Sequence, residues 1–171
     1  MPADDGPSTI IVMGVSGSGK TTVGRALAES LGFEYLDADW LHTAINITKM
    51  AGGDALNDLD RLPWLDAIGQ RLREVRDHGR SSVTACSALK RRYRDVLRDF
   101  VPDTYFVFLS GSQELLQSRL DVRKHQFMPT SLLASQLAIL EPLEEDEQGL
   151  RVDITCDVNH IVGQIRTTLG A

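Results

Sequence analysis

Short apolar runs rich in β-branched and aromatic residues alternate with segments whose apolar residues recur at helical spacing. The five apolar runs cover residues 9–15, 33–37, 81–88, 104–111 and 151–157. The helical patterns cover residues 20–31, 64–77, 112–125, 130–140 and 158–169. Alternating strands and helices build βαβ units, in which the strands are parallel and helices cover both faces of the sheet. The pattern therefore predicts a three-layer α/β/α domain with ligands beyond the carboxyl ends of its strands.

The length of the chain, 171 residues, suggests one domain. We expect residues 1–8 to form a flexible N-terminal tail, without the apolar core of a signal peptide, and residues 9–171 to form a single domain. The acidic stretch 141–149, "EPLEEDEQG", is expected to be a solvated turn before the last strand.

Composition narrows the class of protein. Apolar residues make up 42% of the chain, enough for one core, and the net charge of −6 argues against nucleic-acid and anionic-membrane partners. The two cysteines, Cys86 and Cys156, form no CxxC pair, which favours a reducing compartment without disulfides. No apolar run approaches the roughly 20 residues of a membrane helix. We expect a soluble, cytoplasmic protein.

The stretch "GVSGSGKTT" directly follows the first apolar run and matches the phosphate-loop pattern G-x-x-x-x-G-K-[ST]. Its glycines let backbone N–H groups point at a phosphate, and the following helix adds its positive N-terminus. Lys20 is expected to reach the β- and γ-phosphates, and the Thr21 hydroxyl to hold Mg²⁺. The expected nucleotide contacts are Gly14, Ser16, Gly17, Ser18, Gly19, Lys20, Thr21 and Thr22.

The rest of the chain favours ATP and a small acceptor molecule. No DxxG switch segment and no NKxD-like guanine reader stand out in the sequence, which lowers the GTPase interpretation. A single small domain with a phosphate loop suggests a kinase for a small molecule.

The stretch "YLDADWLH" starts at the end of the second predicted strand, so its carboxylates should lie beside the phosphate loop. One carboxylate can orient Mg²⁺ through water, which we assign to Asp37, and the other can accept the proton of an attacking hydroxyl, which we assign to Asp39. The alternative is that either residue only caps the next helix. Zinc is disfavoured, because two Asp and one His without further Cys or His make a poor tetrahedral set.

Six stretches together resemble the bacterial-type, or thermoresistant, gluconokinase family over about residues 9–157. They are "GVSGSGK", "LDADWLH", "NITKM", "GDALNDLDRLPWL", "CSALKRRYRDVLR" and "FMPTSLLASQLAILEPL". The phosphate loop is widespread, whereas the fourth and fifth stretches are family-specific. The resemblance implies Mg²⁺-dependent transfer of the ATP γ-phosphate to the 6-hydroxyl of D-gluconate. It also implies a five-stranded parallel sheet in the order 2-3-1-4-5 and a mobile helical lid at about residues 119–140.

Gluconate is a polyol that ends in a carboxylate, so its site needs hydrogen-bond acceptors for the hydroxyls and a cation for the anion. Asp39 and His42 are the expected acceptors, and Ser87 should face the same edge. The candidate cations are Lys49, Arg61, Lys90 and Arg94. Helical spacing places Lys90 and Arg94 on one side, although a basic helix face is often only solvated. Trp64 begins an apolar stripe and is expected to pack in the core.

The lid should carry charge onto the phosphates. Arg119 and Arg123 lie four apart on one helical face, and Arg123 joins Lys20 and Asp39 as an expected catalytic residue. Arg119 has the alternative of stacking on adenine, beside a turn at 155–159. Relatives usually read R-K-G-H-F where this chain reads "RKHQF", so Gln126 cannot take over a histidine function. We expect Arg123 and Lys124 to supply the charge and His125 to face solvent.

Two alternatives stay open at this point. One is another small P-loop kinase, acting on shikimate or a nucleoside monophosphate. The other is a non-catalytic ATP-sensing module, against which the intact set of Lys20, Thr21 and Asp39 argues, because a sensor needs no proton acceptor. With the family resemblance, the expected partners are ATP, D-gluconate and a second copy of the chain in a homodimer.

Overall fold

A five-stranded parallel sheet forms the centre of the molecule. The computed structural model describes residues 8–123 and 131–171. The strands are β1 (Thr9–Met13), β2 (Glu34–Asp37), β3 (Ser82–Ala85), β4 (Tyr105–Ser110) and β5 (Gly149–Asp153). They follow the order β2-β3-β1-β4-β5, and every neighbouring pair is parallel. The predicted fold and strand order are confirmed.

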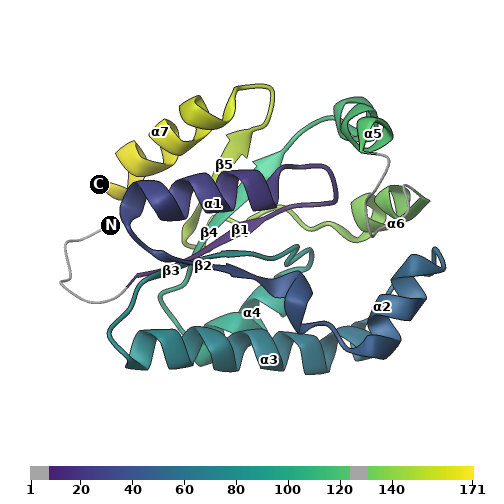
Figure 1. The fold of residues 1–171 in the computed structure, drawn as a ribbon, viewed down its shortest axis with the longest axis horizontal. Coiled ribbons are helices and arrows are strands. Elements are labelled where there is room, and N and C mark those ends of the chain that lie inside the picture. The colour runs from purple at the N-terminus through teal and green to yellow at the C-terminus, as the bar shows by residue number, and fades with distance from the viewer. Residues whose placement is uncertain (1–7, 124–130) are drawn as a thin grey trace.

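Helices cover both faces of this sheet. They are α1 (Lys20–Leu31), α2 (Ala44–Ala51), α3 (Asp58–Asp77), α4 (Arg91–Phe100), α5 (Gln113–Val122), α6 (Ser131–Ile139) and α7 (Val158–Leu169), with a 3₁₀ turn, η1 (Ala38–Leu41). Figure 1 shows α1 and α7 on one face and α3 and α4 on the other. Helices α2, α5 and α6 gather beyond the end of the sheet at which β1 runs into α1 (Figure 1).

The core follows from the apolar strands. All five residues of β1 are buried, as an inner strand of a sheet covered on both faces requires. No helix in the described residues is long and apolar enough to cross a membrane. Cys86 and Cys156 are both free, as expected.

Two helices differ from the sequence prediction. Helix α3 begins at Asp58 rather than at residue 64, because Asn57 and Asp60 form a reciprocal capping box ahead of the apolar stripe. Helix α2 was not predicted. It has eight residues and leaves Ile45 77% exposed, so it carries no clear apolar face.

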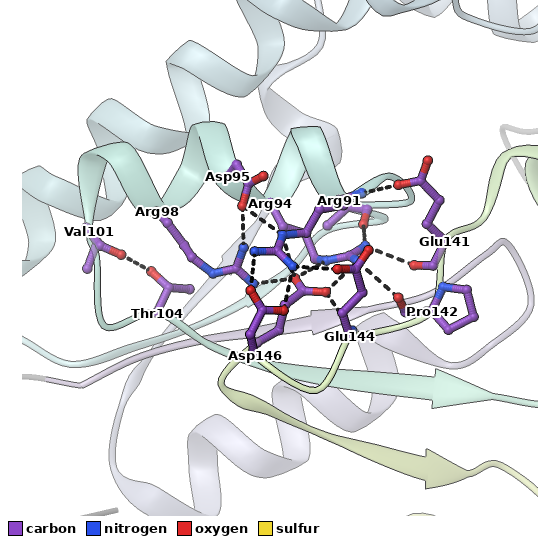
Figure 2. A network of polar contacts seen from close by, with 12 residues as sticks. Arg91, Arg94, Asp95, Arg98, Val101, Thr104, Glu141, Pro142, Glu144 and Asp146 are labelled. Carbon is purple, nitrogen blue, oxygen red and sulfur yellow. Dashed lines mark hydrogen bonds and ion pairs between the residues drawn. The ribbon is translucent and has the colours of Figure 1, made fainter.

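The acidic stretch 141–149 is only partly a solvated turn, since Glu147 is buried. Its carboxylate accepts hydrogen bonds from Arg94 Nε at 2.7 Å and Nη2 at 2.8 Å, and both side chains are 0% exposed. Arg94 also donates to the carbonyl oxygens of Ala88 and Glu141. Figure 2 shows Arg91, Arg94 and Arg98 of α4 converging on this stretch. The guanidinium of Arg94 has no face open to a substrate, so the prediction that Arg94 binds the substrate anion is wrong.

Candidate active site

The phosphate loop lies between the end of β1 and the start of α1. Gly19, the N-cap of α1, has φ 96°, a left-handed conformation that only glycine adopts without strain. A Cβ on Gly14 would lie 2.7 Å from Ser18 Oγ, so the first glycine lets the loop close on itself. The sequence pattern and the backbone geometry therefore agree.

Lys20 is held over this loop, its Nζ donating to the carbonyl oxygen of Val15 at 3.1 Å. Burial lowers the pKa of Lys20, while Asp39 and Asp37 act in the opposite direction. Ser18 Oγ is buried and has no hydrogen-bond partner among the described residues. A buried hydroxyl beside a lysine and inward-facing amides suits a bound phosphate group.

The two carboxylates of the second strand end have different surroundings. Asp37 accepts the N–H of Asp39 at 3.0 Å and the hydroxyl of Tyr35 at 3.1 Å, so it caps η1 as the alternative interpretation expected. The Asp39 side chain is 70% exposed, yet desolvation by the protein around it raises the pKa of its carboxylate. Lys20 opposes this shift and Asp37 adds to it. Asp39 is thus the carboxylate open to a ligand near Lys20.

His42 lies behind Asp39 and is packed against Trp64. The two rings stack with their centroids 4.2 Å apart, and the Trp64 indole donates to the carbonyl oxygen of Ala38 at 2.7 Å. His42 Nε2 lies 3.9 Å from Asp39 Oδ1, and its Nδ1 is buried with no partner among the described residues. Burial, and then the charge of Arg61, lower the pKa of His42 to about 4. The imidazole is therefore neutral near pH 7. Trp64, 1% exposed, is core, as predicted.

A chain of polar contacts runs from Arg61 of α3 to the start of α4. Arg61 donates to the hydroxyl of Tyr93 at 3.3 Å, and that hydroxyl donates to Asp58. Lys90 Nζ donates to the same Asp58 carboxylate at 3.0 Å. Tyr93 and Asp58 were missed by the sequence reasoning, although both lie in family-specific stretches. Only their position within these stretches could have pointed to them, because neither a tyrosine nor an aspartate by itself suggests an anion-binding site.

The remaining candidates lie around this chain. Lys49 Nζ is paired with Asp60 at 2.8 Å, and this pair joins α2 to the first turn of α3. The backbone carbonyl of Ser87 accepts the N–H of Gly14 at 3.3 Å, which places Ser87 beside the phosphate loop. The structure thus places His42 beside Asp39, joins Arg61 to Lys90 through Tyr93 and Asp58, and places Ser87 beside the phosphate loop. Lys49 is engaged with Asp60.

A cavity of about 590 Å³ lies on the other side of the loop. Arg119 Nη2 donates to the carbonyl oxygen of Ile154 at 2.6 Å, which fixes this side chain at the cavity wall. The turn expected to line adenine contributes Cys156, Asp157 and Val158. The full lining is Ser18, Gly19, Thr22, Val23, Ser118, Arg119, Val122, Arg123, Ile154, Cys156, Asp157, Val158 and Ile161. This size and shape suit a nucleotide base and sugar.

Part of the expected lid lies outside the described residues, namely Lys124, His125 and Gln126. Within the described part of the chain, no group of three or more His, Cys, Asp or Glu residues could cage a metal ion.

The chain is similar to gluconokinases of known sequence and structure. A family model described as an AAA domain matches residues 10–143. The thermosensitive gluconokinase of Escherichia coli is 41% identical over 92% of this chain and 85% of the relative. A crystal structure of a Sinorhizobium meliloti gluconokinase is 46% identical, with a TM-score of 0.83 over 92% of this chain and 89% of that one. An unliganded sugar kinase from a Janibacter species is 43% identical, with a TM-score of 0.93 over 96% and 95%. With its phosphate loop and its sheet order, the chain belongs to the gluconokinase family.

Proposed function

We propose that this protein transfers the γ-phosphoryl group of ATP to the 6-hydroxyl of D-gluconate, giving ADP and 6-phospho-D-gluconate. The observation that carries the proposal is the position of Asp39, whose carboxylate is attracted by the half-buried Lys20 and lies 3.9 Å from His42 Nε2, close to the polar chain that joins Arg61 to Lys90. One carboxylate thus faces a phosphate site on one side and a site for a polyhydroxy anion on the other. Gluconokinases at 41–47% identity over most of the chain support this choice of acceptor.

In this reaction the 6-oxygen forms a bond to the γ-phosphorus as the bond from that phosphorus to the bridging β-oxygen breaks. The hydroxyl proton goes to the Asp39 carboxylate, whose raised pKa makes it a better proton acceptor than an ordinary aspartate. Lys20 balances the charge that spreads over the phosphoryl oxygens and the leaving ADP. Arg123, at the end of α5, adds a second cation beside the nucleotide cavity.

The acceptor site matches the chemistry of a sugar acid. His42 stays neutral, so its ring nitrogens can exchange hydrogen bonds with hydroxyl groups. Lys90 donates to Asp58, and Arg61 is joined to the same carboxylate through Tyr93. The two cations together exceed the single negative charge of Asp58, which leaves a net positive charge for the carboxylate of gluconate. Ser87 and Lys49 complete the proposed contacts. In this assignment Arg94 has no part.

The residues also fit Mg²⁺. This ion takes one or two protein oxygens together with phosphate oxygens and water, so it needs no protein cage. The hydroxyl of Thr21, an exposed residue at the start of α1, and the carboxylate of Asp37 are the oxygens that would hold it, directly or through water. When bound, it neutralises charge on the β- and γ-phosphates. Arg119 and the 155–159 turn would hold the adenine. The homodimer and the lid boundaries at residues 119–140 stay predictions.

The test is ADP release measured by a coupled assay with gluconate, shikimate and nucleoside monophosphates as acceptors. We expect turnover with gluconate alone, and its loss in Lys20→Ala while the circular dichroism spectrum stays folded. Faster turnover of shikimate or of a nucleoside monophosphate would show that gluconate is not the acceptor. ATP binding without turnover of any acceptor would favour a sensing module instead.

A further inference from the structure

A glutamine on α6 contacts the phosphate loop from 120 positions away in the sequence. Gln136 Oε1 accepts the backbone N–H of Ser16 at 2.7 Å, and the Gln136 residue is only 7% exposed. A backbone N–H can only donate, so this contact fixes which end of the side-chain amide faces the loop. Ser16 is the third residue of the loop, between Gly14 and the lysine-bearing turn. The loop conformation thus depends on a side chain from outside the motif.

Helix α6, which carries Gln136, is anchored by buried apolar side chains. Leu132 lies four residues before Gln136 and therefore on the same helical face. It is buried in a small apolar cluster with Met50 of α2 and Leu56 of the α2–α3 connection. Leu133 packs in the main core, and after the helix the N–H of Glu141 donates to the carbonyl oxygen of Leu89 at 2.8 Å. One face of α6 thus touches the acceptor-side helix through Leu132 and the phosphate loop through Gln136.

We propose that Gln136 is a positioning residue for phosphoryl transfer, which holds the first half of the phosphate loop in its nucleotide-binding conformation. Because Gln136 takes the Ser16 N–H, Ser16 shapes the loop and leaves the phosphate contacts to the amides from Gly17 to Lys20. The inference rests on the proposed function only in assuming that the loop binds ATP for transfer. Gln136 thus holds the loop at Ser16, a role that is filled neither by the residues of the phosphate-loop motif nor by Arg119 and Arg123.

The chemistry of the side chain explains why an amide suits this position. A carboxylate of the same shape would also accept the Ser16 N–H, but it would bring a negative charge beside the polyphosphate. An apolar side chain of similar length would fill the space but accept nothing. Comparing Gln136→Glu with Gln136→Met therefore separates the hydrogen bond from the charge.

The experiment measures kcat with saturating gluconate and the affinity for ADP by calorimetry in both variants. For Gln136→Met we expect kcat and ADP affinity each to fall about threefold to tenfold, as loss of the neutral hydrogen bond to the Ser16 N–H implies. The KM for gluconate should change less than twofold. For Gln136→Glu we expect ADP affinity to fall further at low salt and to recover partly as salt is added, because salt screens the new charge. A purely structural role of Gln136 predicts no such salt dependence.

The matched control is Ser135→Ala, which removes a hydrogen bond to the Leu132 carbonyl within the same helix and leaves the loop contact in place. It should keep wild-type kcat and ADP affinity. Wild-type values in Gln136→Met, or equal losses in Gln136→Met and Ser135→Ala, would overturn the proposal. So would Gln136→Glu binding ADP as wild type at low salt. The ADP arm needs no acceptor, so it tests Gln136 even if the acceptor were not gluconate.

Discussion

At the scale of single residues, two carboxylates that lie two positions apart, Asp37 and Asp39, have different hydrogen-bond partners. Asp37 is engaged by the N–H of Asp39 and by Tyr35, whereas the Asp39 carboxylate makes no hydrogen bond of that kind within the described residues and faces Lys20. Because Asn caps a helix as well as Asp does, the two positions can be compared by the same substitution.

We predict that Asp39→Asn lowers kcat by about 10²–10⁴, the usual cost of losing a general base. The affinity for ADP should barely change, because the phosphate loop is untouched. Coupled ADP release and calorimetry measure the two quantities. Asp37→Asn is the comparison and should lose less activity, since asparagine keeps the cap and still offers a carbonyl oxygen toward Mg²⁺ or its bound water. Equal loss of activity in both variants would leave the division of their roles without support.

His42 provides a pH-dependent contribution to stability. Its pKa in the folded protein is about 4, below the ordinary value of 6.5. The unfolded chain therefore binds a proton first as the pH falls, so the contribution is complete above about pH 6.5 and is lost between there and about pH 4. We predict that the free energy of unfolding in urea falls by up to about 2 kcal/mol from this group between pH 7 and pH 5.

The control for this prediction is His42→Gln, in which that fall should be smaller by the same amount. An identical pH dependence in His42→Gln and wild type would show that the imidazole is not held neutral.

At the scale of elements, the acceptor side depends on the close packing of α3 against α4. Gly69 allows this approach, because a Cβ there would lie 2.1 Å from the Phe100 ring. The same two helices carry Asp58, Arg61 and Tyr93, so their separation sets the distances in the polar chain.

We predict that Gly69→Ala destabilises the fold by about 1–3 kcal/mol, because the added methyl group must push α3 and α4 apart. Gly163→Ala is the matched control. Gly163 also lies within a helix, α7, and a Cβ there would meet nothing within 4 Å. That change should stabilise by up to about 1 kcal/mol through helix propensity. Urea unfolding measures both, and a gain in both variants would contradict the packing argument.

At the scale of the whole molecule, buried charge ties the segment before β5 to α4. Glu147 is desolvated by burial, but hydrogen bonds from Arg94 and Arg98 more than offset this and lower its pKa to about 2 (Figure 2 shows the arginines). Its contribution is therefore present above about pH 4.5 and is lost as the pH falls toward 2. The pH range over which the Glu147 contribution to stability is lost therefore lies below the range for His42.

We predict that Glu147→Gln destabilises the protein by about 3–5 kcal/mol, because Arg94 would stay buried without its carboxylate. Glu144→Gln removes an acid that pairs with Arg91 but is 60% exposed, and it should cost less than about 1 kcal/mol. Thermal unfolding of the two variants at pH 7 provides the comparison. Similar melting temperatures for both would mean that the buried pair contributes no more than a surface pair.

The local sequence pattern was enough to predict the parallel sheet and the position of the phosphate loop. The order of the strands was predicted from the family resemblance. Helices with a clear apolar stripe, such as α1 and α7, were placed to the residue. The sequence pattern missed residues 58–63 of α3 and the whole of α2, because capping and side-chain pairing hold them rather than an apolar face. Arg94 was assigned to the substrate because helical spacing shows which side of α4 the side chain lies on. Spacing does not show that Glu147, 53 residues later, pairs with it.

The sequence by itself determined the nucleotide chemistry of this protein, because a phosphate loop is contiguous and its glycines, lysine and threonine act through local backbone geometry. It also determined that Asp39 follows β2 at the ligand-binding edge. Only the tertiary structure decided which charges are free. It buried Arg94 with Glu147, gave Asp37 the N–H of Asp39 as a partner while the Asp39 side chain stayed exposed, and brought Gln136 to Ser16. Such pairings join residues far apart in the chain, and burial decides their ionisation, so neither can be inferred from spacing along the sequence.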